Sequence, residues 1–423
     1  MTTEYAGNPD HPVFLGRQPI LDREQRIVAY ELLFRSSAGR NAALIEDDFA
    51  ATSEVVVRAF TDMGLTSVLG DCLGFINVDE RFLVSEIVEL LPRDRVVLEV
   101  LETVEITPKV VARLSELKAM GFQLALDDYS ETRPDYADAL SIVDVVKVDL
   151  PLVKNGQLAS VVQHLRRWPP KMLAEKVDNN EQFQICSQLG FELFQGYFFA
   201  KPTILVGRRV DPAQVGVLRL MNLVLGDVEV GAMEDEFKRY PNLTYKLLRL
   251  VNSVAFAIPT KIHSLRQALV LLGKRQVQRW LQLLLFTQQT GGAPGHPLLT
   301  LAAARGKQME LMMEYLTPGN RENADRAFMV GMLSLLDALL GAPLPEVLAE
   351  LNLVDPVRVA LLSSEGTLGH LLEIVRLFEQ NRFAEATQRL LSDLPSLALW
   401  QVNQTQLQAL SWANELSASN SEK

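Results

Sequence analysis

The chain has 423 residues, and its 48% apolar content excludes disordered and low-complexity protein. At about 150 residues per domain, this length predicts two or three domains. Its two cysteines, Cys72 and Cys186, exclude a disulfide framework and a zinc site of four thiolates. The net charge of −11 resides in residues 1–202, with 20 basic and 31 acidic residues, whereas residues 203–423 hold 21 of each. This balance argues against a large basic face for duplex nucleic acid. The polar N-terminus predicts no signal peptide and no apolar stretch predicts a membrane span, so a cytoplasmic protein is expected.

The first half alternates short apolar runs with amphipathic stretches of helical period. Strands are predicted at residues 27–34, 73–78, 96–101, 122–126, 143–148, 172–174 and 191–194, and helices at 53–63, 107–120, 152–166 and 180–189. Repeated strand–helix units with buried parallel strands predict a compact (β/α) barrel of the TIM type over residues 13–202, after a polar tail at 1–12. An open doubly wound sheet is the alternative. No Gly-x-Gly-x-x-Gly follows the first strand, which argues against a dinucleotide-binding fold.

The second half contains no convincing strand, and an all-helical domain is predicted over residues 203–415. Helices are expected at 212–225, 233–238, 243–252, 264–272, 275–287, 299–315, 326–340, 345–351, 356–362, 367–380, 384–394 and 405–414. The change from alternating strands and helices to helices alone places the domain boundary near Lys201-Pro202. Residues 416–423 are expected to form a polar, frayed tail.

Polar side chains stand at the carboxyl ends of the predicted strands, which meet at one rim of a parallel barrel. Five carboxylates, one amide and one lysine occupy equivalent positions: Glu31, Asn77, Glu99, Asp127, Asp128, Lys147 and Glu175. A single acid there usually caps the next helix, but caps would be scattered among Ser, Thr and Asn. Carboxylates in nearly every unit instead indicate Mg²⁺ or Mn²⁺, which prefer oxygen ligands. Paired ions suit phosphodiester hydrolysis, in which Lys147 can orient water and Arg35 can bind a phosphate at two points.

Motifs along residues 13–202 resemble those of the EAL domain, the cyclic di-GMP phosphodiesterase family. They are Gln18-Pro19-Ile20, Glu31-Leu32-Leu33-Phe34-Arg35, Asn77, Leu98-Glu99-Val100-Leu101-Glu102, Asp127-Asp128, Lys147-Val148-Asp149, Ala174-Glu175-Lys176-Val177-Asp178 and Gln195-Gly196-Tyr197. The resemblance implies metal ligands at Glu31, Asn77, Glu99, Asp127 and Asp128. It implies catalytic roles for Lys147, Glu175 and Gln195, substrate contacts for Gln18, Arg35 and Asp149, and support of a loop by Glu102.

The sequence departs from this family at two places near the expected site. The family's glycine-bearing loop after the Asp-Asp pair, which helps to hold metal and couples to dimerisation, is replaced here by Tyr129-Ser130-Glu131-Thr132-Arg133-Pro134. The family also has a glycine directly after the glutamate that corresponds to Glu175, and here that glycine is replaced by Lys176. Because glycine alone adopts left-handed backbone freely, both changes predict a rebuilt support for the metal ligands.

The second half resembles an HDOD domain, a helical relative of the HD phosphohydrolases. The stretch from Tyr240-Pro241-Asn242-Leu243-Thr244 to Val251-Asn252-Ser253 carries this resemblance, together with residues 264–273. Where the HD pattern has a His-Asp doublet, this chain has Ser334-Leu335. The helical domain is therefore predicted to bind a protein partner rather than to catalyse a reaction.

Two functions are compatible with the sequence. The first is hydrolysis of cyclic di-GMP to linear pGpG with Mg²⁺ or Mn²⁺, two ions being expected. The second is a catalytically inactive adaptor or cyclic di-GMP sensor that acts through protein contacts. The ligand set favours the first function, and the rebuilt loop favours the second. Homodimerisation is compatible with either.

Overall fold

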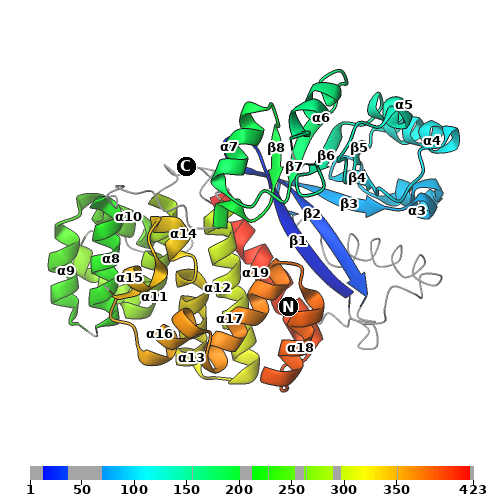
Figure 1. The fold of residues 1–423 in the computed structure, drawn as a ribbon. Coiled ribbons are helices and arrows are strands. Elements are labelled where there is room, and N and C mark those ends of the chain that lie inside the picture. The colour runs from blue at the N-terminus through cyan, green and yellow to red at the C-terminus, as the bar shows by residue number, and fades with distance from the viewer. Residues whose placement is uncertain are drawn as a thin grey trace. The chain divides into compact units, whose positions relative to one another are not determined.

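The computed structural model describes residues 13–36, 69–154, 156–200, 212–226, 228–252, 262, 264–288, 297–349 and 351–419. These residues form two compact units, a barrel and an all-helical unit (Figure 1). The barrel unit combines the described residues of 13–200 with residues 374–419, and the helical unit holds most of the described residues of 212–373. The predicted helix at 53–63 and the tail at 1–12 lie outside the described residues.

Eight strands form a closed barrel in the order of the sequence. They are β1 (Val13–Leu21), β2 (Ile27–Ser36), β3 (Leu73–Val78), β4 (Val96–Val100), β5 (Gln123–Leu126), β6 (Val145–Asp149), β7 (Lys171–Glu175) and β8 (Leu193–Gln195). From β2 to β8 each strand is parallel to the next, as predicted. β1, where no strand was predicted, is antiparallel to both β2 and β8. The reason is the connection: a tight turn, closed by the Asp22 N–H bond to the Arg26 carbonyl, joins β1 to β2 without a helix.

A layer of apolar side chains fills the inside of the barrel. It takes one residue from each of the first seven strands: Ile20, Ala29, Phe75, Val97, Ala125, Val145 and Leu173, none more than 5% exposed. Alternate residues of a strand face the same side of a sheet. The next inward position toward the carboxyl rim therefore lies two residues further along β2 to β7, and two residues earlier along antiparallel β1.

Short helices follow the strands of the barrel. They are α3 (Glu80–Val84), α4 (Pro108–Ala119), α5 (Ala137–Leu140), α6 (Leu158–Leu165) and α7 (Asn180–Gln188), with 3-10 turns η1 (Glu86–Leu90), η2 (Pro134–Tyr136) and η3 (Phe198–Ala200). Three helices begin at a capping side chain, Asp79, Thr107 or Asn179, which accepts a backbone N–H of the first turn. α6 is shorter than the predicted helix at 152–166 because the carboxylate of Asp149 accepts the N–H of Leu152 and turns the chain there.

The helical unit contains no strand among its described residues. Its helices are α8 (Pro212–Leu225), α9 (Val230–Lys238), α10 (Pro241–Val251), α11 (Leu265–Gln288), α12 (Pro297–Leu316), α13 (Arg321–Leu333), α14 (Leu336–Leu340), α15 (Leu344–Ala349), α16 (Asp355–Ser363) and the first part of α17 (Gly366–Glu379), whose residues from Ile374 belong to the barrel unit. Gly273, with φ of 68°, divides α11 into two parts, in agreement with the two helices predicted there. The single helix predicted at 326–340 is wrong, since the chain breaks at Ser334-Leu335. No helix in the described part of the chain is both long and apolar enough to cross a membrane.

Ser334, which stands in place of the HD histidine, is buried and hydrogen-bonded in the helical unit. Its hydroxyl accepts a bond of 2.6 Å from Nη1 of Arg305 and donates to the carbonyl of Gly331. A methyl group on Gly331 would lie 2.6 Å from Cα of Gly306, so the backbones of α12 and α13 are in contact at this point. This close approach brings the guanidinium of Arg305, which is 2% exposed, to the Ser334 hydroxyl.

The last helices of the chain pack on the barrel. α18 (Phe383–Asp393) and α19 (Leu399–Ser419) belong to the barrel unit, and α19 lies beside β1 (Figure 1). The hydroxyl of Tyr197 donates a hydrogen bond of 3.1 Å to Oε2 of Glu379, at the end of α17. The sequence predicts that residues 374–415 belong to the helical domain and that a frayed tail begins at 416. In the structure residues 374–419 cover the barrel, and α19 continues to Ser419.

Candidate active site

The inward positions next to the apolar layer hold a ring of polar residues at the carboxyl rim of the barrel. Seven of them stand two residues from a member of that layer: Gln18, Glu31, Asn77, Glu99, Asp127, Lys147 and Glu175. Gln195, the last residue of β8, completes the ring. Strand pairing places Gln18 opposite Glu31 and Asn77 opposite Glu99. The period of two along a strand thus brings together side chains that lie far apart in the sequence.

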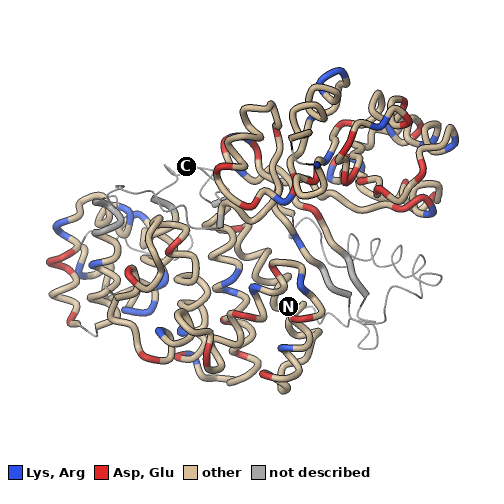
Figure 2. Tube along the Cα trace, in the orientation of Figure 1, with Lys and Arg blue, Asp and Glu red and all other residues tan. Residues whose placement is uncertain are grey.

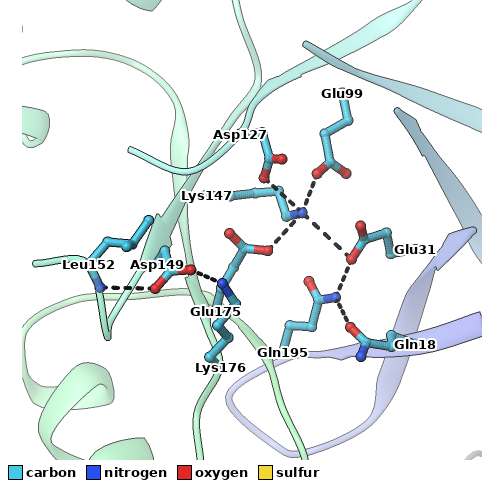
Figure 3. Close-up of polar contacts among 10 residues, drawn as sticks. All are labelled: Gln18, Glu31, Glu99, Asp127, Lys147, Asp149, Leu152, Glu175, Lys176 and Gln195. Carbon is cyan, nitrogen blue, oxygen red and sulfur yellow. Dashed lines mark hydrogen bonds and ion pairs between the residues drawn. The ribbon is translucent and has the colours of Figure 1, made fainter. Parts of the chain in front are cut away.

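Lys147 lies at the centre of this ring and is 1% exposed (Figure 3). Its Nζ is 2.8 Å from Oε1 of Glu175 and 3.2 Å from Oδ1 of Asp127. The same nitrogen pairs with Oε1 of Glu99 and lies 3.7 Å from Oε2 of Glu31. One ammonium group therefore contacts four carboxylates, from β2, β4, β7 and the residue that follows β5.

A chain of hydrogen bonds links β8 to the first hairpin. Nε2 of Gln195 donates to Oε2 of Glu31 and, at 2.7 Å, to Oε1 of Gln18 (Figure 3). Gln195 is 3% exposed and Glu31 7% exposed, so these bonds lie in the buried part of the site. They fix the orientation of the Glu31 carboxylate, which is a predicted metal ligand.

The site carries more negative charge than Lys147 can balance. Asp and Glu residues recur throughout the barrel unit (Figure 2). Burial raises the pKa of Glu175 to about 7, and burial raises the pKa of Glu99 well above its usual range. Burial lowers the pKa of Lys147, but the surrounding carboxylates outweigh this effect and hold that pKa above its ordinary value. The ammonium is therefore charged at neutral pH, while the carboxylates compete for too little positive charge.

A second group of acids lies at the rim of the same site. Carboxylate oxygens of Glu102, Asp127 and Asp128 lie within 4.8 Å of one another. Burial, and next the negative charge of Asp127, raise the pKa of Asp128 to about 6. The resemblance assigned Glu102 only to loop support. The structure places its carboxylate beside the Asp127-Asp128 pair, where it can also contribute a ligand atom.

Several buried oxygens in the ring have no hydrogen-bond donor among the described residues. They are Oδ1 of Asn77, Oε2 of Glu99, Oε2 of Glu175 and Oε1 of Gln195. A buried polar atom without a partner is costly, and oxygens of this kind are the ligands that hard divalent cations prefer. The donor set therefore fits a divalent cation bound among these side chains.

Asp149 lies beside the ring and does not contact Lys147. It is fully buried, its Oδ1 accepts the N–H of Leu152, and its Oδ2 pairs with Nζ of Lys176 (Figure 3). Lys176 is in the left-handed region, with φ of 56°, at the position where the family has glycine. The role of Lys176 as the partner of Asp149 was not predicted, although its replacement of glycine marked the position. The side chain of Arg35 lies outside the described residues.

Comparison with known proteins identifies both units. The EAL domain profile matches residues 13–202, and the HDOD domain profile matches residues 215–352. The cyclic di-GMP phosphodiesterase CdgJ of Vibrio cholerae is 31% identical over 412 residues, which cover 96% of this chain and 93% of CdgJ. The chain belongs to the family of EAL–HDOD proteins. A second relative, the uncharacterized protein YuxH of Bacillus subtilis, is 32% identical over 378 residues, which cover 88% of this chain and 91% of YuxH.

Solved EAL structures are also similar to this EAL–HDOD protein. The YkuI protein of Bacillus subtilis, solved in complex with c-di-GMP and calcium, is 22% identical and matches with a TM-score of 0.37, covering 58% of this chain and 65% of YkuI. BlrP1 of Klebsiella pneumoniae, solved as a calcium and cyclic di-GMP complex, is 24% identical with a TM-score of 0.38, covering 48% of this chain and 58% of BlrP1. The matched HDOD segment ends at residue 352, so residues 374–419, which cover the barrel, lie beyond both matched segments.

Proposed function

We propose that the EAL barrel hydrolyses one phosphodiester bond of cyclic di-GMP and releases the linear dinucleotide pGpG. Water attacks phosphorus, the bond from phosphorus to the 3′ oxygen breaks, and the 3′ oxygen takes up a proton. The observation that carries this proposal is the ring around Lys147, in which buried carboxylate and amide oxygens surround one ammonium group. The similarity to CdgJ over nearly the whole chain supports the choice of substrate.

The proposed cofactor is Mg²⁺ or Mn²⁺, bound as two ions. Its ligands would be Glu31, Asn77, Glu99, Asp127 and Asp128, with Glu102 as an additional ligand at the rim. A bound divalent cation lowers the pKa of water and stabilises negative charge on a phosphoryl oxygen. The unpartnered buried oxygens and the excess of carboxylates support this assignment.

The remaining ring residues have separate proposed tasks. Glu175, whose Oε1 lies 2.8 Å from Nζ of Lys147, accepts the proton of the attacking water. Lys147 is the fixed positive charge that holds the carboxylates together and stabilises charge on the phosphate. Gln195 orients Glu31, and Gln18 and Arg35 contact the substrate. Asp149 is engaged by Leu152 and Lys176, so its proposed role is to hold Lys176 at the mouth of the site rather than to bind substrate itself.

The test is a product analysis with the full-length protein. Purified protein is incubated with cyclic di-GMP and either Mg²⁺ or Mn²⁺, and the nucleotides are separated by chromatography. The expected result is pGpG that forms only when a divalent cation is present. Absence of product with both metals, in a protein that binds cyclic di-GMP in calorimetry, would establish the second candidate function, a sensor. The rebuilt loop after Asp128 and the left-handed Lys176 are the features that favour this alternative.

We also propose that the HDOD domain binds a protein partner and does not catalyse a reaction. The hydrogen bond from Arg305 to Ser334 supports this, because Ser334 stands where the HD pattern has histidine. A pull-down that compares the full-length wild-type chain with the full-length Asp127→Asn variant would show whether a partner binds independently of the barrel site. Metal-dependent phosphatase activity that survives substitution of Asp127 would contradict the proposal.

A further inference from the structure

The loop that follows the Asp127-Asp128 pair differs from the family pattern, and the structure describes how it is held. The chain leaves β5, passes through Asp128 with φ of 46°, and reaches η2 at Pro134. A left-handed conformation is uncommon for a residue other than glycine, although aspartate tolerates it better than most. Surrounding contacts must therefore hold Asp128 in this conformation, because no glycine lies between it and η2.

Tyr129 makes the contacts that fix the start of the loop. Its backbone N–H donates a bond of 2.9 Å to the carbonyl of Lys147, the residue at the centre of the ring. Its side chain is 2% exposed, and its hydroxyl accepts a bond of 3.1 Å from the backbone N–H of Arg133. Tyr129 thus joins the loop to β6 by its backbone and closes the loop on itself by its side chain.

Side-chain contacts of Tyr136, Arg133 and Asp135 complete the packing of the loop. The ring of Tyr136 lies edge to face with the ring of Tyr129, with centroids 6.1 Å apart. The guanidinium of Arg133 lies 4.1 Å above the Tyr136 ring and forms an ion pair of 2.9 Å with Asp135. Aromatic pairs and cation–π contacts both stabilise the packing of such side chains. The loop is therefore ordered by its own side chains, without the glycines of the family pattern.

We propose that Tyr129 is a positioning residue for the metal-binding Asp127-Asp128 pair. Asp128 lies between Asp127, whose oxygen contacts Lys147, and Tyr129, whose N–H binds the Lys147 carbonyl. Both ends of this three-residue segment are thus attached to the same residue of β6. The buried ring of Tyr129 prevents the segment from moving away from the site. The inference rests on the proposed function for its metal, and its readout is metal binding in the absence of nucleotide.

The experiment compares Tyr129→Leu with Tyr129→Phe and with a control variant of similar instability. The control is Leu117→Ala, which creates a cavity at a fully buried residue of α4 that belongs neither to the loop nor to the ring. For each protein, calorimetry gives the Kd for Mn²⁺, and thermal unfolding gives the Tm without metal. Tyr129→Leu is expected to weaken Mn²⁺ binding by about tenfold or more, a typical effect of losing support for a metal ligand. Tyr129→Phe, which keeps the packed ring, is expected to remain within about threefold of wild type, whereas Leu117→Ala lowers the Tm and leaves the Kd unchanged.

A wild-type Kd for Tyr129→Leu would overturn the inference. So would an equal loss of affinity in Leu117→Ala, because the effect would then follow from general instability. A wild-type protein that binds Mn²⁺ but produces no pGpG would contradict the proposed function alone, since the positioning role is decided by the Mn²⁺ affinities.

Discussion

Nζ of Lys176 forms an ion pair with Oδ2 of Asp149, a carboxylate that is fully buried. Lys176 makes this contact from a left-handed backbone conformation that glycine adopts without strain. Two opposing effects therefore act at Lys176: the ion pair stabilises the folded state, and the left-handed backbone conformation destabilises it. Substitution of Lys176 by methionine and by glycine separates the two effects on the stability of the metal-free protein.

Lys176→Met is expected to destabilise more than Lys176→Gly. Both substitutions leave the Asp149 carboxylate buried without its ammonium partner, which costs about 1–3 kcal/mol. Only glycine relieves the left-handed conformation, which is worth about 1 kcal/mol. Urea unfolding of the metal-free proteins measures the difference. Equal free energies of unfolding for wild type and both variants would show that neither effect operates.

Asp127→Asn is expected to abolish the rise in Tm that Mn²⁺ causes in the wild-type protein. A ligand that binds only the folded state stabilises it, and asparagine keeps the size of Asp127 while removing the charge that binds the cation. The matched control is Asp138→Asn on α5, whose side chain is exposed and lies outside the ring. A Mn²⁺-dependent shift of wild-type size in Asp127→Asn would contradict the proposed ligand set.

Metal binding should weaken as the pH falls from 8 to 6. Without metal, the pKa is about 6 for the proposed ligand Asp128, so protons compete with the cation there as the pH falls. The pKa of Glu175, which lies in the same ring, is about 7, so its protonation removes a negative charge that attracts the cation. Each displaced proton weakens the apparent affinity by up to about tenfold per pH unit. Calorimetric titration with Mn²⁺ at pH 6 and pH 8, in buffers of different ionisation enthalpy, measures both the affinity and the protons released. An affinity that does not change between these pH values would contradict the raised pKa values.

The stability of the metal-free protein should fall as the pH rises, whereas its affinity for metal should increase. The folded-state pKa of Glu175 is about 7, above the value of about 4.3 for an unfolded glutamate. Between these two values the folded state binds more protons than the unfolded state, so raising the pH through this window lowers the contribution of Glu175 to stability. Glu175→Gln should remove this part of the pH dependence in urea unfolding, because glutamine does not titrate. A variant with the wild-type pH profile would assign the effect to another group.

Phe383→Ala on α18 should destabilise the barrel. Phe383 is 8% exposed, and a methyl group on Gly16 of β1 would lie only 2.9 Å from its Cζ, so the two segments are in close contact. Loss of a buried phenylalanine costs about 3 kcal/mol. Leu391→Ala on the same helix is the control, since Leu391 is 69% exposed and should change stability little. Equal effects of the two substitutions would indicate that α18 does not support the barrel.

The strands from β2 to β8 and most of the candidate site could be predicted because each site residue directly ends, or directly follows, an apolar run in the sequence. Buried parallel strands appear as short apolar runs, and a polar residue at the end of each run is conspicuous. β1 could not be predicted in the same way, because Gly16, Arg17, Gln18 and Pro19 interrupt its apolar pattern. The structure accommodates Arg17 by stacking its guanidinium 3.8 Å from the centre of the Tyr30 ring.

Two other features depend on contacts that a sequence pattern does not specify. The amphipathic pattern of residues 384–394 predicts that one helix face is buried, but it does not indicate which part of the chain covers that face. In the structure this segment belongs to the barrel unit, so the predicted domain grouping differs from the observed units. The packing of Tyr129 on Tyr136 and the pairing of Lys176 with Asp149 likewise arise from backbone conformations that become visible only in the folded chain.

The most direct test of the central claim, that the ring around Lys147 is a catalytic site, compares wild type with Glu175→Gln. Calorimetry measures binding of cyclic di-GMP, and chromatography measures formation of pGpG with Mn²⁺. The account predicts that the wild type forms pGpG, and that Glu175→Gln retains binding but turns over at least about a hundredfold more slowly, as expected for loss of a proton acceptor. Wild-type turnover by Glu175→Gln, or no pGpG from the wild type, would contradict it.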